Sequence, residues 1–258
     1  MSGSIHSNVN EHICTVTVDN EGKRNAIDFS MVEEVIAVFE AIEERDKRTV
    51  VVMRGAGEKA FSAGFDLSVD RSERTEEQKK LWPKMIDAIE RYTYPVIAMI
   101  NGDTYGGAME IIAACDVRIG VEGARFGITP AKIGLVYGGQ AINRIMNIIG
   151  PAKTKEMLFT ANAIHADHAA EIGLLNYVVE RQELEDRTYD IAEDIAGNAP
   201  LSLRAMKEII DALLDKRRLS EVEVKWIQQL RDEAFASEDH QEGVQAFDEE
   251  RQPEFRDR

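Results

Sequence analysis

Two glycine-containing segments are the parts of this 258-residue sequence best suited to binding a developing negative charge. The first spans residues 61–66 (FSAGFD) and the second spans residues 102–107 (GDTYGG). Each follows a short apolar run that is typical of a buried strand. Glycine lets the backbone approach a ligand closely, and a helix beginning after the second segment has N–H groups without intrahelical acceptors. One such donor from each segment could hold an oxyanion, although the same glycines could equally serve only to pack strands against helices.

A third candidate for chemistry is Glu110, which lies three residues after Gly107 among apolar neighbours (residues 108–112, AMEII). A carboxylate in such surroundings can have a shifted pKa and take part in proton transfer. A negative charge in the first turn of a helix is also favourable in itself, because it faces the positive end of the helix dipole. The pattern leaves both interpretations open.

Other motifs with possible chemical meaning are weaker. Residues 55–60 (GAGEKA) match the dinucleotide fingerprint G-x-G-x-x-A, but they run into another glycine loop instead of a long helix. His165 and His168 are spaced to share a helix face, with Asp167 between them, yet no further ligand is evident and no metal site is predicted. No G-x-S-x-G elbow of a serine hydrolase is present.

Composition excludes several classes of partner. The formal net charge of −16 disfavours nucleic acid, because phosphate binding needs a basic surface. No apolar run approaches the roughly 20 residues that cross a bilayer. The first residues lack the basic and apolar regions of a secretory signal, so we expect a cytoplasmic protein without membrane contact. Cys14 and Cys115 lie far apart in apolar surroundings, which predicts buried, inert thiols.

The elements that must position these segments alternate between strands and helices over the first two thirds of the chain. Apolar and β-branched runs predict strands at residues 12–18, 49–53, 95–100, 116–121 and 124–126. Helical spacing predicts helices at residues 26–44 with Ser30 as a possible N-cap, and at 108–114, 139–149, 152–160, 166–172, 184–197, 200–214 and 220–237. The charged stretch 71–80 is expected to be an exposed loop that enters a helix ending near residue 92. This order indicates an α/β core followed by a helical C-terminal region.

Several motifs, in this order, resemble the crotonase superfamily, the enoyl-CoA hydratase/isomerase family. They are residues 23–27 (KRNAI), 61–67 (FSAGFDL), 95–110 (PVIAMINGDTYGGAME), 126–127 (FG) and 172–175 (IGLL). The resemblance runs from about His12 to the C-terminus, and it favours the oxyanion interpretation of the glycines. It implies an α/β fold with a crotonase-like ββα spiral core at residues 1–197. It also implies a helical C-terminal trimerisation region at residues 198–258, and hence a homotrimer or a hexamer made of two trimers.

The same resemblance implies an acyl-CoA substrate whose thioester oxygen is held as an enolate between the N–H groups of Phe65 and Gly107. It matches Glu110 to the first of the two catalytic glutamates of the hydratases. Lys23 and Arg24 would meet the coenzyme A phosphates. The further substrate-binding positions implied by the family are Ala26, Ala63, Asp66, Leu67 and Thr129. Coenzyme A is part of the substrate, so no separate cofactor and no metal are implied.

One departure from the hydratase pattern changes the expected reaction. Pro130 stands where the second hydratase glutamate would fall, and proline cannot exchange a proton. The chain resembles the methylmalonyl-CoA decarboxylase subgroup better, through Thr129-Pro130 and through Gly134 to Tyr137, although this subgroup has a histidine at the position of Phe65. Loss of carbon dioxide from a malonyl-type thioester itself generates the enolate, so no base is needed to remove a proton first.

In that reaction the resemblance gives Tyr137 the task of orienting the carboxylate through its hydroxyl, whereas the alternative is a loop tyrosine packed on the surface. Glu110 would position a group or help to protonate the enolate. Two other functions remain open. One is an enoyl-CoA hydratase or isomerase that uses Glu110 as its single catalytic carboxylate, and the other is a non-catalytic oligomeric binding protein that keeps the fold.

Overall fold

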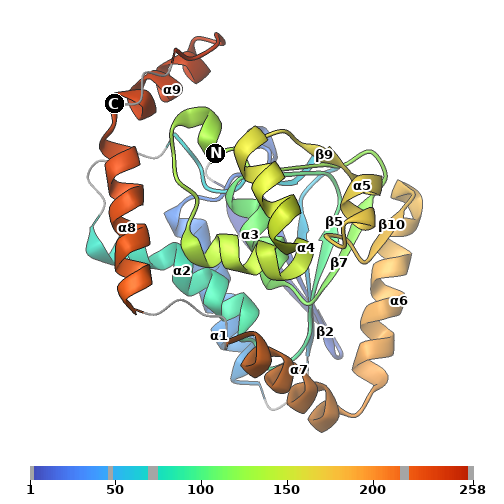
Figure 1. The fold of residues 1–258 in the computed structure, drawn as a ribbon. Coiled ribbons are helices and arrows are strands. Elements are labelled where there is room, and N and C mark those ends of the chain that lie inside the picture. The colour runs from blue at the N-terminus through green and yellow to red at the C-terminus, as the bar shows by residue number, and fades with distance from the viewer. Residues whose placement is uncertain (1–2, 46–48, 69–74, 216–220, 255–258) are drawn as a thin grey trace.

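The computed structural model describes residues 3–45, 49–68, 75–215 and 221–254. Two sheets form its core (Figure 1). The larger sheet has the strand order β1-β2-β3-β5-β7-β10. Its strands are β1 (Ser4–Asn10), β2 (Ile13–Asp19), β3 (Val50–Gly55), β5 (Val96–Ile100), β7 (Val117–Val121) and β10 (Tyr177–Val179). Within this sheet only β1 and β2 pair antiparallel, and every residue of β5 is buried.

The smaller sheet has the order β4-β6-β8-β9, with β4 (Ala60–Ser62), β6 (Asp103–Tyr105), β8 (Arg125–Gly127) and β9 (Ile164–His165). The chain passes three times through a strand of the larger sheet, a strand of the smaller sheet and then a helix. The helices that complete the three turns are α2 (Glu76–Glu90), α3 (Gly107–Ala114) and α4 (Gly139–Thr160). The predicted α/β fold with a ββα spiral core is therefore confirmed.

Helix α1 (Phe29–Glu43) begins later than predicted, and its N-cap is Asp28 instead of Ser30. The Asp28 carboxylate accepts a hydrogen bond from the Met31 N–H at 3.0 Å. The two residues before Asp28 are not helical, because Ile27 pairs with Phe65 in a parallel β-bridge.

Helix α2 also has well-defined ends, between Thr75 and Arg91. Thr75 and Gln78 form a capping box, so the predicted loop at 71–80 is helical from residue 76 onward. Residues 71–74 of that prediction lie outside the described part of the chain. The helix ends at Glu90, slightly before the predicted position.

The two helices predicted at 139–149 and 152–160 are the two parts of α4, which bends at Gly150 (φ 73°, ψ 165°). Helices α5 (Ala166–Glu171) and α6 (Leu184–Gly197) lie close to their predicted ranges. The prediction that two helices close the chain is incomplete. After α7 (Pro200–Asp215) and α8 (Glu221–Ala236), Ser237 caps a further helix, α9 (Glu238–Asp248).

The C-terminal helices carry many exposed apolar side chains, and α8 runs beside α2 at the outer side of the core (Figure 1). The most exposed large apolar side chains of α7 and α8 are Leu201, Met206, Ile209, Ile210, Leu213, Val222 and Trp226. Lys207 joins α7 to the core, because its ammonium group donates to the Asp116 carboxylate at 2.7 Å. The boundary at residues 197 and 198 stays a prediction.

Short 3₁₀ helices complete the described structure at Glu21–Lys23 (η1), Pro130–Ile133 (η2) and Arg181–Glu183 (η3). Helix α9 supports η2 closely, since a ring nitrogen of His240 donates to the Ile133 carbonyl at 2.7 Å. A methyl group added at Gly134 would lie 2.7 Å from the Cα of His240, so the backbones of the two elements are in contact.

Cys14 and Cys115 are buried free thiols, as predicted, and burial raises the pKa of Cys14 to about 11.

Candidate active site

A cavity of about 670 Å³ lies between α2, α3, η2, α4, α7 and α8. Seven of the residues predicted for the site contribute to its wall: Ala63, Phe65, Leu67, Gly107, Glu110, Thr129 and Tyr137. The other four, Lys23, Arg24, Ala26 and Asp66, lie outside this lining. The structure therefore gathers all four predicted catalytic residues around one cavity.

The backbone at Phe65 and Gly107 brings two N–H groups to this cavity. In the bridge to Ile27, the Ile27 N–H donates to the Gly64 carbonyl at 2.8 Å and the Asp66 N–H donates to the Ile27 carbonyl at 2.9 Å. The N–H of Phe65 points to the opposite side of its strand, as alternation along a strand requires. Gly107 is the first residue of α3, so its N–H has no acceptor within the helix.

The two loops approach each other closely because both carry glycine. A methyl group added at Gly64, where φ is +85°, would lie 2.5 Å from the Gly107 nitrogen. One added at Gly107 would lie 3.4 Å from the Phe65 nitrogen. The glycines thus permit the close packing of the two loops, which brings the Phe65 and Gly107 nitrogens near each other; their role as oxyanion donors stays a prediction.

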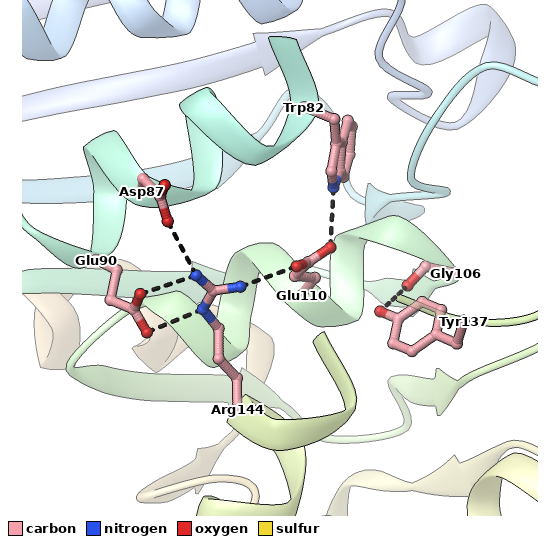
Figure 2. A network of polar contacts seen from close by, with 7 residues as sticks. All are labelled: Trp82, Asp87, Glu90, Gly106, Glu110, Tyr137 and Arg144. Carbon is pink, nitrogen blue, oxygen red and sulfur yellow. Dashed lines mark hydrogen bonds and ion pairs between the residues drawn. The ribbon is translucent and has the colours of Figure 1, made fainter. Parts of the chain in front are cut away.

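The carboxylate of Glu110 is held at both oxygens (Figure 2). Trp82 Nε1 donates to Oε2 at 2.9 Å, and Arg144 Nη1 donates to Oε1 at 3.0 Å. Burial raises the pKa of Glu110, and this effect exceeds the opposing influence of the Arg144 charge and the Trp82 hydrogen bond. Glu110 is therefore a shielded carboxylate inside the cavity wall, with its orientation fixed.

Arg144 in turn is surrounded by carboxylates from α2 (Figure 2). Its Nε and Nη2 bind the two oxygens of Glu90 at 2.9 and 2.8 Å, and Nη2 also lies 3.2 Å from Asp87 Oδ1. The side chain is only 11% exposed. Burial opposes its charge, but the hydrogen bonds and charge of Glu90 raise the pKa of the guanidinium, so Arg144 remains a cation.

Tyr137 packs against the core and faces the cavity instead of the outer surface. Its hydroxyl donates to the carbonyl of Gly106, the residue before α3, at 3.0 Å (Figure 2). Burial raises the pKa of Tyr137 well above its ordinary value, so the group is a neutral phenol that can donate a hydrogen bond.

An aromatic cluster forms the wall beside the two backbone donors. Phe65 makes edge-on contacts with Phe29 and with Trp82, at ring-centre distances of 5.0 and 5.8 Å. Phe29, Trp82, Glu90 and Arg144 were not predicted from the sequence. The available signal for Arg144 was a single charged residue among the apolar positions of the helix predicted at 139–149.

The predicted contacts to coenzyme A involve residues that are paired with each other. Lys23 Nζ lies 2.6 Å from Asp66 Oδ2 and 2.9 Å from Ser68 Oγ. Burial would raise the pKa of Asp66, but the hydrogen bonds from Lys23 and Ser68 lower it below its usual value. The Arg24 carbonyl accepts from the Ala63 N–H at 2.9 Å, so this loop lies against the loop that carries Phe65. The roles of these residues toward coenzyme A stay predictions.

The weaker sequence patterns have structural explanations. Residues 55–60 lead from β3 into β4 and open no helix, so the dinucleotide fingerprint is absent there. The His168 ring lies 2.9 Å from Glu171 Oε2. Within the described residues, no three His, Cys, Asp or Glu side chains gather as metal ligands, and no helix is both long and apolar enough to cross a bilayer.

Comparison with known proteins places this geometry in a family. The model of the family described as enoyl-CoA hydratase/isomerase matches residues 8–258. The chain is 32% identical to methylmalonyl-CoA decarboxylase of Escherichia coli K12 over 235 residues, which cover 90% of each protein. It is 33% identical to short-chain-enoyl-CoA hydratase of Clostridium acetobutylicum over 245 residues, covering 94% of this chain and 93% of the relative. A crystal structure of methylmalonyl-CoA decarboxylase complexed with 2S-carboxypropyl CoA superimposes with a TM-score of 0.91 at 29% identity over the full length of both chains.

The chain belongs to the enoyl-CoA hydratase/isomerase family, and it is an acyl-CoA enzyme of the crotonase superfamily. Its relatives include both decarboxylases and hydratases. The particular reaction must therefore be inferred from the residues of its own cavity.

Proposed function

We propose that this protein decarboxylates a malonyl-type CoA thioester. The observation that carries the proposal concerns the two positions that hold catalytic glutamates in the hydratases, which are Glu110 and Pro130 in this chain. Pro130 lines the cavity at the position matched to the second hydratase glutamate, and both oxygens of Glu110 already accept hydrogen bonds. Hydration normally uses two carboxyl groups, one to activate water and one to protonate carbon. Decarboxylation needs neither of them to begin.

In the proposed reaction, the bond between the α-carbon and the carboxylate breaks, and its electron pair passes into the thioester to give an enolate. The N–H groups of Phe65 and Gly107 stabilise the charge that develops on the thioester oxygen. Carbon dioxide leaves, and the α-carbon then takes up a proton. The hydroxyl of Tyr137 exchanges the Gly106 carbonyl for the departing carboxylate as its acceptor and orients this carboxylate out of the thioester plane. The similarity to methylmalonyl-CoA decarboxylase in sequence and structure supports this assignment.

The remaining parts of the proposal concern binding and assembly. Lys23 and Arg24 contact the coenzyme A phosphates, while the loops of Ala26, Ala63, Asp66, Leu67 and Thr129 bind the rest of the thioester. Coenzyme A belongs to the substrate, and no further cofactor takes part. The exposed apolar side chains of α7 and α8 support a homotrimer or a hexamer in the cytoplasm, because such a surface is typical of an interface between copies.

A second candidate is an enoyl-CoA hydratase or isomerase that uses Glu110 as its single catalytic carboxylate. The raised pKa of Glu110 favours it, since a carboxyl group that titrates nearer to neutral pH is a better acid and base. The similarity to short-chain-enoyl-CoA hydratase also favours it.

The test is to incubate the purified protein separately with malonyl-CoA, methylmalonyl-CoA and crotonyl-CoA and to follow the products by mass spectrometry. Loss of carbon dioxide from a malonyl-type thioester, with no hydration of crotonyl-CoA, supports the first proposal. Rapid hydration without carbon dioxide release contradicts it and supports the second. Tyr137→Phe serves as the matched variant, because it keeps the ring and removes only the hydroxyl that orients the carboxylate.

A further inference from the structure

The wall of the cavity contains a cation that neither proposed reaction uses directly. Arg144 on α4 contacts three carboxylates, namely Glu110 on α3 and both Glu90 and Asp87 on α2. Its bond to Glu90 is bidentate, whereas its bond to Glu110 is single. A bidentate contact fixes both the position and the plane of the guanidinium. Glu90 therefore holds Arg144 in place, and Arg144 presents one remaining N–H to Glu110 (Figure 2).

Glu110 is well placed to reach a bound enolate. It lies three residues after Gly107 on α3, and residues at this spacing share one face of a helix. Both residues line the same cavity. The thioester oxygen bound at the Gly107 N–H would thus have its α-carbon on the side of the cavity that contains the Glu110 carboxylate. Trp82 donates to Oε2 of Glu110 and Arg144 donates to Oε1. The direction in which the Glu110 carboxylate points therefore depends on both residues.

We propose that Arg144, anchored by Glu90, is a positioning residue for proton transfer at the α-carbon, and that Glu110 is the group that carries the proton. This inference deepens the proposed function and rests on it for the direction of the reaction. After carbon dioxide has left, the enolate electron pair forms a bond to the proton of the Glu110 carboxyl group. The carboxylate that remains is stabilised by Arg144 and takes its next proton from water.

The charges around Glu110 make this inference testable through pH. The groups around Glu110 come from three helices and one loop. They are Trp82, Asp87 and Glu90 from α2, Arg144 from α4, Tyr137 from the loop before α4, and Arg231 from α8. Among them Arg144 lowers the pKa of Glu110, whereas the charge of Glu90 raises it. Removal of Arg144 must therefore raise this pKa, and removal of Glu90 must lower it. A purely structural role of the same ion pair predicts no such opposite shifts.

The experiment measures loss of deuterium from the α-carbon of propionyl-CoA, a thioester without a carboxylate to lose. In this exchange Glu110 first acts as a base, so the rate rises with pH as its carboxyl group ionises. Arg144→Met should move this rise to higher pH, because it removes the positive charge that lowers the pKa of Glu110. Glu90→Gln should move it to lower pH. Arg144→Lys should restore the pH position in part, but not the rate, because lysine lacks the planar fork.

The matched control is Lys153→Met, which removes a cation from the same helix but from an exposed pair with Glu156. It should leave the exchange unchanged. Equal losses of rate in all Arg144 and Glu90 variants, with the pH profile unmoved, would overturn the inference. So would the absence of exchange in the unaltered protein, or full exchange in Glu110→Gln. If Arg144→Met does not fold, the direction of the shift in Glu90→Gln decides.

The two proposals can fail separately. Exchange with opposite pH shifts, but without decarboxylation of any malonyl-type thioester, would refute the proposed function and leave the assignment of Arg144 intact. Decarboxylation without exchange would refute the assignment of Arg144 and leave the proposed function intact.

Discussion

Substitution of Gly107 by alanine tests how the backbone at the start of α3 and the orientation of Glu110 depend on each other. The added methyl group would lie 2.6 Å from Cζ2 and 3.0 Å from Cη2 of Trp82. Carbon atoms prefer separations of about 3.5–4.0 Å, so the indole must move by about 1 Å. Trp82 Nε1 is now 2.9 Å from Glu110 Oε2, and such a movement takes the pair beyond hydrogen-bond range.

The size of the effect follows from two costs. Overpacking a filled site costs about 1–3 kcal/mol, and losing a hydrogen bond to a charged group costs about 1.5–3 kcal/mol. We expect Gly107→Ala to lower the free energy of unfolding by about 2.5–6 kcal/mol, the sum of the two costs. If the transition state needs the same orientation of Glu110, turnover should fall about 10- to 100-fold, since each 1.4 kcal/mol corresponds to a factor of ten.

The assay combines chemical denaturation with turnover of the best CoA thioester found in the substrate panel. Trp82→Phe supplies the partner variant, because phenylalanine lacks the outer indole ring that the methyl group meets. The double variant should be more stable than the sum of the single effects predicts, by about 1 kcal/mol. Gly197→Ala is the control, since nothing lies within 4 Å of a methyl group there, and its stability should stay unchanged or rise slightly.

Two results would refute this reasoning. Strict additivity of Gly107→Ala and Trp82→Phe would show that the methyl group and the indole do not meet. Normal turnover by a folded Gly107→Ala protein would show that the hydrogen bond from Trp82 to Glu110 has no part in catalysis.

Three further predictions concern other contacts. Tyr137→Phe removes the hydroxyl that donates to Gly106, so carbon dioxide release should fall about tenfold or more while the melting temperature changes little, as about 1 kcal/mol per hydrogen bond suggests. Lys207→Met leaves the Asp116 carboxylate without its cation and should cost about 1–3 kcal/mol in urea unfolding; an unchanged midpoint would show that α7 is held by other contacts. Ile209→Asp places a charge on the exposed face of α7 and should dissociate the proposed oligomer in analytical ultracentrifugation without loss of helix content; an unchanged sedimentation coefficient would contradict an interface at this face.

The long elements of the fold were predictable because their apolar residues repeat with a clear period. The short strands β4, β6 and β9 were not, since two or three residues cannot show alternation, whereas β8 was predicted one residue early, at residues 124–126. Strand β1 was missed for a different reason. Its sequence, SIHSNVN, is mostly polar and exposed, and it is a strand because its backbone pairs with β2 from Ser4 opposite Asp19 onward.

The candidate site also has one part that could be predicted from the sequence and another part that could not. Glycine spacing after two buried strands indicated loops that could meet, and only the resemblance to the crotonase superfamily assigned Phe65 and Gly107 as the donors, a role that stays a prediction. The partners of Glu110 could not be predicted, because Arg144 and Trp82 come from separate helices and meet it only through the packing of α2 and α4 on α3. Composition gives no measure of such a pairing, and neither residue belongs to a local motif.

The contact between α9 and η2 affects the order in which parts of the fold are completed during synthesis. Helix η2 carries the Thr129 and Pro130 wall of the cavity, but the ring of His240 that holds its Ile133 carbonyl is synthesised more than a hundred residues later, as their separation of 107 positions shows. Chains fold from the N-terminus as they leave the ribosome. The spiral core can therefore be complete while this wall still lacks its support, and a nascent chain gains its finished pocket only after α9 has emerged.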